Sequence, residues 1–153
     1  MRSYLHFAKG LDPVADAFAG TVVSDVVSMR NHRTVCFLIH KGIGVTGTSK
    51  ITVEACSTAA AAAVAAVPFR YQAITSDDVH SEMVDCESTG FDTIAGSSQR
   101  YAVYVDHDDL VLTGYEFVRL KAVEVVDSPV LGGIEIIMLD PRNDQAVQDT
   151  VLS

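Results

Sequence analysis

The sequence has no tryptophan, few aromatic residues and few basic residues. Aromatic residues make up 7% of the chain, and 11 Lys and Arg stand against 20 Asp and Glu, which gives a net charge of −9. Such a chain repels a phosphate backbone, and no basic cluster offsets the repulsion, so nucleic acid is not expected as a partner. The longest uncharged apolar run, residues 59–69, is far shorter than the roughly 20 residues that span a bilayer, so no membrane partner is expected either.

The sequence also lacks paired cysteines and an apolar leader. Cys36, Cys56 and Cys86 are odd in number and include no CxxC pair, which argues against a disulfide framework and against a zinc site. We interpret them as buried free thiols. Because residues 1–7 contain no long apolar core, no secretory signal is predicted, and the protein is expected to be made and kept in the cytosol.

What the sequence does contain is period-two alternation rich in β-branched residues. Apolar and polar residues alternate over residues 50–55 and 100–106, and residues 34–40 form a continuous apolar run typical of a buried strand. Counted with weaker segments, these runs predict about eight strands separated by turns. The fold class is therefore all-β, an antiparallel β-sandwich or barrel with an extended N-terminal arm. We divide the chain into an arm (1–19), a β domain (20–142) and a polar C-terminal tail (143–153).

Three local departures from regular strands are expected. The alanine-rich residues 59–66 are too few to form a stable helix alone, so they are predicted to form a loop or one docked turn. Residues 106–114 begin with carboxylates and end in glycine, which favours a short helical turn. The alternation of the longest strand, residues 115–126, slips near Ala122, which predicts a bulge there.

No motif in the sequence indicates catalysis. Residues 42–47 match GxGxxG, but a strand pattern follows where a dinucleotide site needs a helix, so they are interpreted as a hairpin loop. Residues 106–109 (DHDD) lack the glycine and the distal glutamate of a calcium loop. The five histidines show no short-range ligand pair, and no serine lies in GxSxG. We therefore expect no enzyme activity, no cofactor and no metal site.

Arg119 and Lys121 are predicted to face outward on the longest strand, flanked by Glu116 and Glu124. Cross-strand charge pairing on a solvent-exposed face is the simpler interpretation. Contact with a neighbouring subunit is the alternative, and for that reason both residues are kept as candidate interface residues.

Six runs together resemble small proteins encoded among the head genes of tailed bacteriophages. They are residues 24–29 (SDVVSM), 44–56 (GVTGTSKITVEAC), 67–71 (VPFRY), 114–121 (GYEFVRLK), 127–133 (DSPVLGG) and 140–142 (DPR). The resemblance spans most of residues 20–142, and its motifs are turn and strand signatures rather than reactive groups. Proteins of this group that are placed in a virion resemble capsid decoration, or cement, proteins, which are often trimeric.

The resemblance implies a virion structural protein on the capsid surface, made in the host cytoplasm, that binds the major capsid protein and itself as a homotrimer. The arm and the tail are expected to reach neighbouring subunits because neither has a self-contained strand pattern. Candidate contact residues are Tyr4, Phe7, Leu11, Phe18, Arg119, Lys121 and Arg142. A tail or head-to-tail joining protein is one alternative. A glycan-binding attachment module is another, which the scarcity of aromatic residues disfavours.

Overall fold

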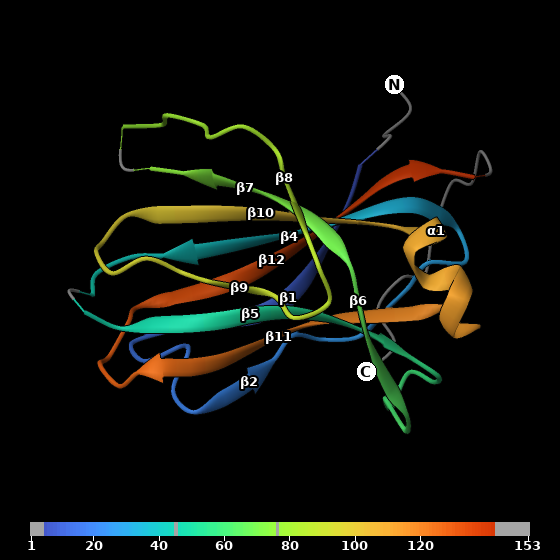
Figure 1. Ribbon diagram of the computed structural model, residues 1–153, viewed down its shortest axis with the longest axis horizontal. Helices are drawn as coiled ribbons and strands as arrows, with labels where there is room; N and C mark the ends of the chain where they lie inside the picture. The colour runs from blue at the N-terminus through green and yellow to red at the C-terminus, as the bar shows by residue number, and fades with distance from the viewer. Residues whose placement is uncertain (1–4, 45, 76, 143–153) are drawn as a thin grey trace.

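The computed structural model describes residues 5–44, 46–75 and 77–142, which form two stacked β-sheets (Figure 1). Sheet A contains, in spatial order, β1 (His6–Val14), β12 (Gly132–Pro141), β4 (His32–Lys41), β10 (Gln99–Asp106), β7 (Phe69–Ile74) and β8 (Val84–Cys86). Sheet B contains β2 (Thr21–Val23), β11 (Phe117–Val126), β5 (Thr48–Cys56) and β6 (Val64–Val67), with β3 (Val27–Ser28) beside β11 and β9 (Phe91–Asp92) beside β5. The predicted antiparallel sandwich is confirmed, and the sheets do not close into a barrel. The described residues form twelve strands rather than about eight, and five of the twelve have only two to four residues.

Alternation along the central strands builds the core. In β4, Val35, Phe37 and Ile39 are completely buried between the sheets, and in β11 the same is true of Val118 and Leu120. Because the side-chain period of a strand is two, the residues between them face away from the core. The inner faces of the two sheets are therefore almost wholly apolar, with aromatic rings such as Phe37 among aliphatic side chains.

The N-terminal segment differs from the expected arm, because β1 is an edge strand of the chain's own sheet. It pairs with β12 from His6↔Met138 to Val14↔Gly132, with register shifts on both sides of Leu11. A second contact holds it: the Asp25 backbone N–H donates to the Gly10 carbonyl at 2.8 Å. Gly10 and the shifts hide the period of two, which explains why the sequence pattern did not predict a strand here.

The glycine-rich loop is not the hairpin loop that was expected, because β4 lies in sheet A and β5 in sheet B and the two strands do not pair. It crosses between the sheets instead and is a packing element. The Gly42 N–H donates to the Leu131 carbonyl at 2.7 Å, and a Cβ on Gly47 would lie 2.4 Å from the Ser128 carbonyl oxygen. The loop therefore lies directly against the turn before β12. The buried Lys41 ammonium holds it from inside by donating to the carbonyls of Gly47 (3.0 Å) and Ile94 (2.7 Å).

The other local predictions have mixed outcomes. The helical turn is confirmed as α1 (His107–Leu110) and the following 3-10 turn η1 (Val111–Thr113), closed by Gly114 at φ +70°. Part of the alanine-rich segment was predicted wrongly, because β6 pairs with β5 there. The register shift of β11 falls between Glu124 and Val126, just after the predicted position. No helix among the described residues has the length and apolar character needed to cross a membrane.

Aromatic rings join the two sheets at the end occupied by β9. Phe91 of sheet B stacks on Tyr71 of sheet A with ring centroids 3.8 Å apart, and it also contacts Phe69 and Tyr101 of sheet A. The Tyr101 hydroxyl accepts a hydrogen bond from the Ile94 N–H and donates one to the Gln99 side-chain oxygen. This cluster closes one end of the sandwich.

Replacing Phe91 with alanine should lower the free energy of unfolding by about 2–4 kcal/mol, because it empties the middle of a cluster that three rings share. Urea unfolding measures the change. Leu112→Ala is the control: Leu112 is 98% exposed, so its effect should stay within about 0.5 kcal/mol. Equal effects of the two substitutions would contradict the assignment of Phe91 to the joint between the sheets.

Candidate protein-binding surfaces

The outer face of sheet A is unusually apolar for a face that no other described element covers. One row in register across five strands consists of Phe7, Ile137, Cys36, Tyr104 and Arg70. Phe7 is 62% exposed, Ile137 and Tyr104 are half-buried, and the Cys36 thiol lies beneath its neighbours. Solvent-facing positions of an antiparallel sheet are normally polar. We call this surface the apolar face.

A groove crosses the apolar face where β12 begins. Gly133 has no side chain there, and the groove of about 560 Å³ lies between β1 and β4. Its apolar lining includes Phe7, Leu38 and Leu131, and Glu135 is among its polar residues. The arrangement suits an apolar or cationic side chain from a protein partner.

A second surface lies at the opposite edge of sheet A, where β8 has no neighbouring strand among the described residues. Here residues 77–87 carry five exposed carboxylates that form no ion pair within the described parts of the chain: Asp77, Asp78, Glu82, Asp85 and Glu87. Exposed apolar side chains lie between them, namely Val79, Met83 and Val84. We call residues 77–87 the acidic edge. The signal was present in the sequence, since residues 71–99 contain no Lys or Arg.

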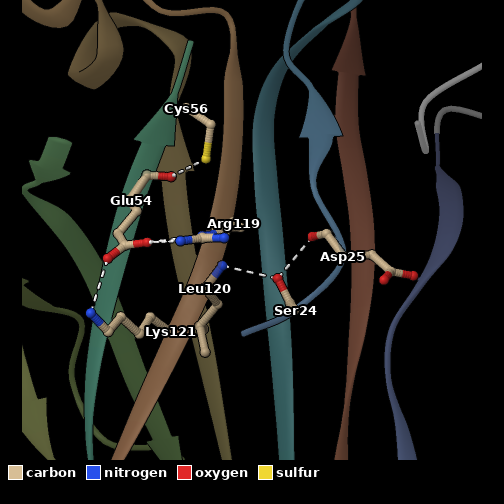
Figure 2. Close-up of polar contacts among 7 residues, drawn as sticks. All are labelled: Ser24, Asp25, Glu54, Cys56, Arg119, Leu120 and Lys121. Atoms are coloured by element: carbon tan, nitrogen blue, oxygen red, sulfur yellow. Dashed lines mark hydrogen bonds and ion pairs between the residues drawn. The ribbon is translucent and has the colours of Figure 1, made fainter. Parts of the chain in front are cut away.

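Arg119 and Lys121 face outward on sheet B, as predicted, but neither Glu116 nor Glu124 is their partner. Both bind the Glu54 carboxylate of β5: Arg119 Nε and Nη2 lie 2.8 and 2.7 Å from Oε2, and Lys121 Nζ lies 3.3 Å from Oε1 (Figure 2). Glu54 is only 7% exposed. The two cations therefore neutralise a buried carboxylate of their own chain.

Beside β11, Ser24 takes part in a hydrogen-bonded connection between the two sheets. The Leu120 N–H donates to the Ser24 hydroxyl at 2.9 Å, and that hydroxyl donates to the Asp25 carbonyl (Figure 2). Asp25 in turn bonds to β1 through its N–H. Two residues thus connect the edge of sheet A to sheet B.

The remaining candidate contact residues are dispersed. Phe18 is 4% exposed and belongs to the chain's own core, and Leu11 packs partly against that core. Arg142 is exposed, with Nε donating to the His32 carbonyl at 3.4 Å. Tyr4 lies outside the described residues, as does the tail from residue 143. Of the predicted arm residues, Phe7 alone is placed with its ring at a described surface.

The carboxylates of Asp106 and Asp109, in the acidic turn at residues 106–109, accept hydrogen bonds from other groups of the chain. The Asp106 carboxylate accepts hydrogen bonds from Thr34 and Arg70, both at 2.6 Å, and Asp109 accepts one from the Asp106 N–H. Burial raises the pKa of Asp109. In the described parts of the chain no group of three or more His, Cys, Asp or Glu side chains is placed to hold a metal ion.

The three cysteines are free thiols, as interpreted from the sequence. Cys36 and Cys56 are buried and Cys86 is partly buried. Burial raises the pKa of Cys36 to about 11, so its thiol is protonated and unreactive at neutral pH.

His32, in contrast, is a buried polar group with one unsatisfied ring nitrogen. It is 1% exposed, and its Nδ1 has no hydrogen-bond partner among the described residues. The His6 ring lies 6.2 Å away, centroid to centroid. Burial, and then the proximity of His6, lower the pKa of His32 below its ordinary value of 6.5.

Comparisons with known proteins find similarity to solved structures and none to a protein family. No known protein family matches the sequence, and no curated protein matches it. The crystal structure of the SPBc2 prophage-derived protein YomS superposes with a TM-score of 0.46 and 10% identity, covering 92% of this chain and 98% of that one. A structure of infectious bursal disease virus, Gx strain, gives a TM-score of 0.16 at 10% identity, with 99% of this chain and 42% of that one covered. One structural neighbour is thus a prophage-derived protein.

Arg119→Met should lower the free energy of unfolding by about 2–3 kcal/mol, because it leaves the buried Glu54 carboxylate with one cation. Lys121→Met should cost less, since Lys121 makes a single, longer contact and its side chain is more exposed (34% against 20%). Urea unfolding at neutral pH ranks the two variants. A larger loss in the lysine variant would contradict the placement of Glu54.

Stability should fall as the pH drops below about 6.5. A histidine with a lowered folded-state pKa binds more protons when unfolded, so its contribution is complete above the unfolded pKa and is lost below it. Chemical unfolding between about pH 7.5 and 5.5 avoids most carboxylate titration. His32→Leu should flatten the pH dependence in this window, and Leu112→Ala, at an exposed site without a titratable group, should leave it unchanged.

Proposed function

We propose that the chain is a bacteriophage virion structural protein, most simply a capsid decoration protein that binds the major capsid protein on the outside of the head. The observation that carries the proposal is the acidic edge: five exposed carboxylates without ion-pair partners among the described residues, in the segment that leads into and includes the edge strand β8. The resemblance of residues 20–142 to head-gene proteins supports the same role. Binding of a protein surface, rather than catalysis, is the proposed activity.

The chemistry of the acidic edge specifies the kind of capsid surface that fits it. Carboxylates at this density attract a basic segment over about 8 Å at physiological ionic strength, which accelerates encounter and selects against acidic partners. Val79, Met83 and Val84 then supply apolar area beside the charges. A basic, extended segment of the capsid protein can also pair its backbone with β8, since a sheet edge accepts an added strand.

Many weak contacts acting in parallel suffice to hold a decoration protein on a capsid. A capsid presents the same binding site repeatedly, so linked contacts raise the effective affinity well above that of one contact. The two-sheet scaffold then serves to hold the acidic edge in a fixed shape. A rigid edge binds with a smaller loss of conformational entropy than a flexible loop does.

The test is binding to heads assembled from the major capsid protein that the same genome encodes. The variant Asp77→Asn, Glu82→Gln, Asp85→Asn removes three charges from the acidic edge. Its affinity in co-sedimentation at low salt should fall by at least about tenfold, because each lost charge contact contributes part of a favourable electrostatic term. The affinity of the unmodified chain should fall with added salt.

The control removes the same charge elsewhere. Asp16→Asn, Asp108→Asn, Asp127→Asn changes three exposed carboxylates outside the acidic edge, and it should bind nearly as well as the unmodified chain. Equal losses in both triple variants would indicate a net-charge effect and contradict the proposed edge. Absence of binding by the unmodified chain to heads would contradict the decoration role itself.

A further inference from the structure

We propose that the apolar face of sheet A is the surface on which a second copy of this chain packs. The contact goes beyond the capsid contact proposed above, because it uses the outer face of β1, β12, β4, β10 and β7 rather than the edge at β8. The inference rests on three features of the face: its apolar character, its extent and its charge balance.

The central strand of sheet A is apolar on both sides. Residues 35–39 of β4 are all apolar, yet only Val35, Phe37 and Ile39 point into the sandwich, which leaves Cys36 and Leu38 on the outer face. Continuous apolar strands are typical of sheets covered on both faces. In β12, Ile137 and Leu139 repeat the pattern beside β4. The strand sequences therefore fit a sheet with a second layer on its outside.

The face is large enough for a specific contact. The five strands from β1 to β7 span roughly 24 Å across and about 24 Å along, which gives on the order of 600 Å² per copy and about 1,200 Å² in a pair. This value lies at the lower end of specific interfaces. A micromolar, concentration-dependent association is expected from such an area.

The charges on the face also permit contact between identical copies. Although the chain carries a net charge of −9, its outward positions on sheet A are nearly balanced. From β1 to β7 they hold three basic side chains and three carboxylates: Lys9, Arg70 and Arg100 with Asp12, Asp106 and Glu135. Two such faces meet without the repulsion that other surfaces of this acidic protein would produce.

The pairing register suggests how the copies are arranged. The row from Phe7 to Arg70 is centred on Cys36 of β4, with one strand beyond each neighbour. A two-fold axis along β4 therefore lays β12 of one copy over β10 of the other. Ile137 then lies over Tyr104, and the Phe7 ring lies over the Arg70 guanidinium, where a cation–π contact is favourable.

The same arrangement brings together two charges that lack ion-pair partners among the described residues. Arg100 of β10 is exposed and lies in the same row as Gly133, so in the pair it sits over the groove. Glu135, one row away on β12, is exposed at the groove's edge. Adjacent rows of outward-facing residues, two positions apart along each strand, are separated by about 7 Å. An arginine side chain can bridge this distance. The pair would contain two such contacts, one on each side of the axis.

Sedimentation analysis of the full chain up to about 100 µM tests the proposal over the affinity range expected for this area. The unmodified chain should show a concentration-dependent increase in mass. Arg100→Glu and Glu135→Arg should each weaken self-association by about tenfold, and the variant carrying both should recover to within about threefold of the unmodified chain, since the contact is restored with reversed sign. Leu38→Lys, which places a charge at the centre of the face, should abolish association.

Two control variants test whether a loss of self-association is specific to substitutions on the apolar face. Arg33→Glu makes the same charge change as Arg100→Glu at an exposed position beyond the rows used, and Leu112→Lys charges an exposed apolar residue of η1. Both should associate like the unmodified chain. A monomeric mass for the unmodified chain at every concentration overturns the proposal, as does a double reversal that stays as weak as the single ones. Absence of capsid binding by an unmodified chain that still self-associates would instead count against the proposed capsid role alone.

Discussion

The structure depends on the register of β4 between β12 and β10. This strand pairs residue for residue with both neighbours over almost its whole length, so its alternation assigns one set of side chains to the core and the other to the outside. A slip by one residue would exchange the two sets. Because both sets are apolar in residues 35–39, the pattern of β4 alone does not choose between them. The choice comes from β12 and β10, whose inner residues, such as Ile136 and Val103, are completely buried.

Strand identity could be predicted from the sequence where alternation is uninterrupted. Residues 34–40 and 100–106 were predicted correctly as strands β4 and β10, and the acidic start and glycine end of residues 106–114 correctly predicted a helical turn. The prediction failed where tertiary pairing overrides local preference. β1 contains Gly10, Pro13 and two register shifts, and β6 is alanine-rich yet pairs with β5.

The candidate surfaces were less accessible to sequence reasoning than the fold. A gap in basic residues over 71–99 is visible in the sequence, but only the strand order shows that part of it borders an open sheet edge. The apolar face combines residues from β1, β12, β4 and β10, which no local pattern connects. Arg119 and Lys121 were recognised as outward-facing, whereas their partner Glu54 lies 65 residues from Arg119 and becomes adjacent only through the pairing of β5 with β11.

The contact of Asp25 with Gly10 has a consequence for how sheets of this protein can grow. A strand edge with unpaired backbone groups recruits further strands, and a molecule with two such edges can polymerise end to end. In sheet A, β1 is bulged on both sides of Leu11, contains Pro13 and already accepts the Asp25 N–H. A strand added at β8, as proposed, would therefore not be matched by regular strand addition at β1, so sheet A offers one edge for growth rather than two.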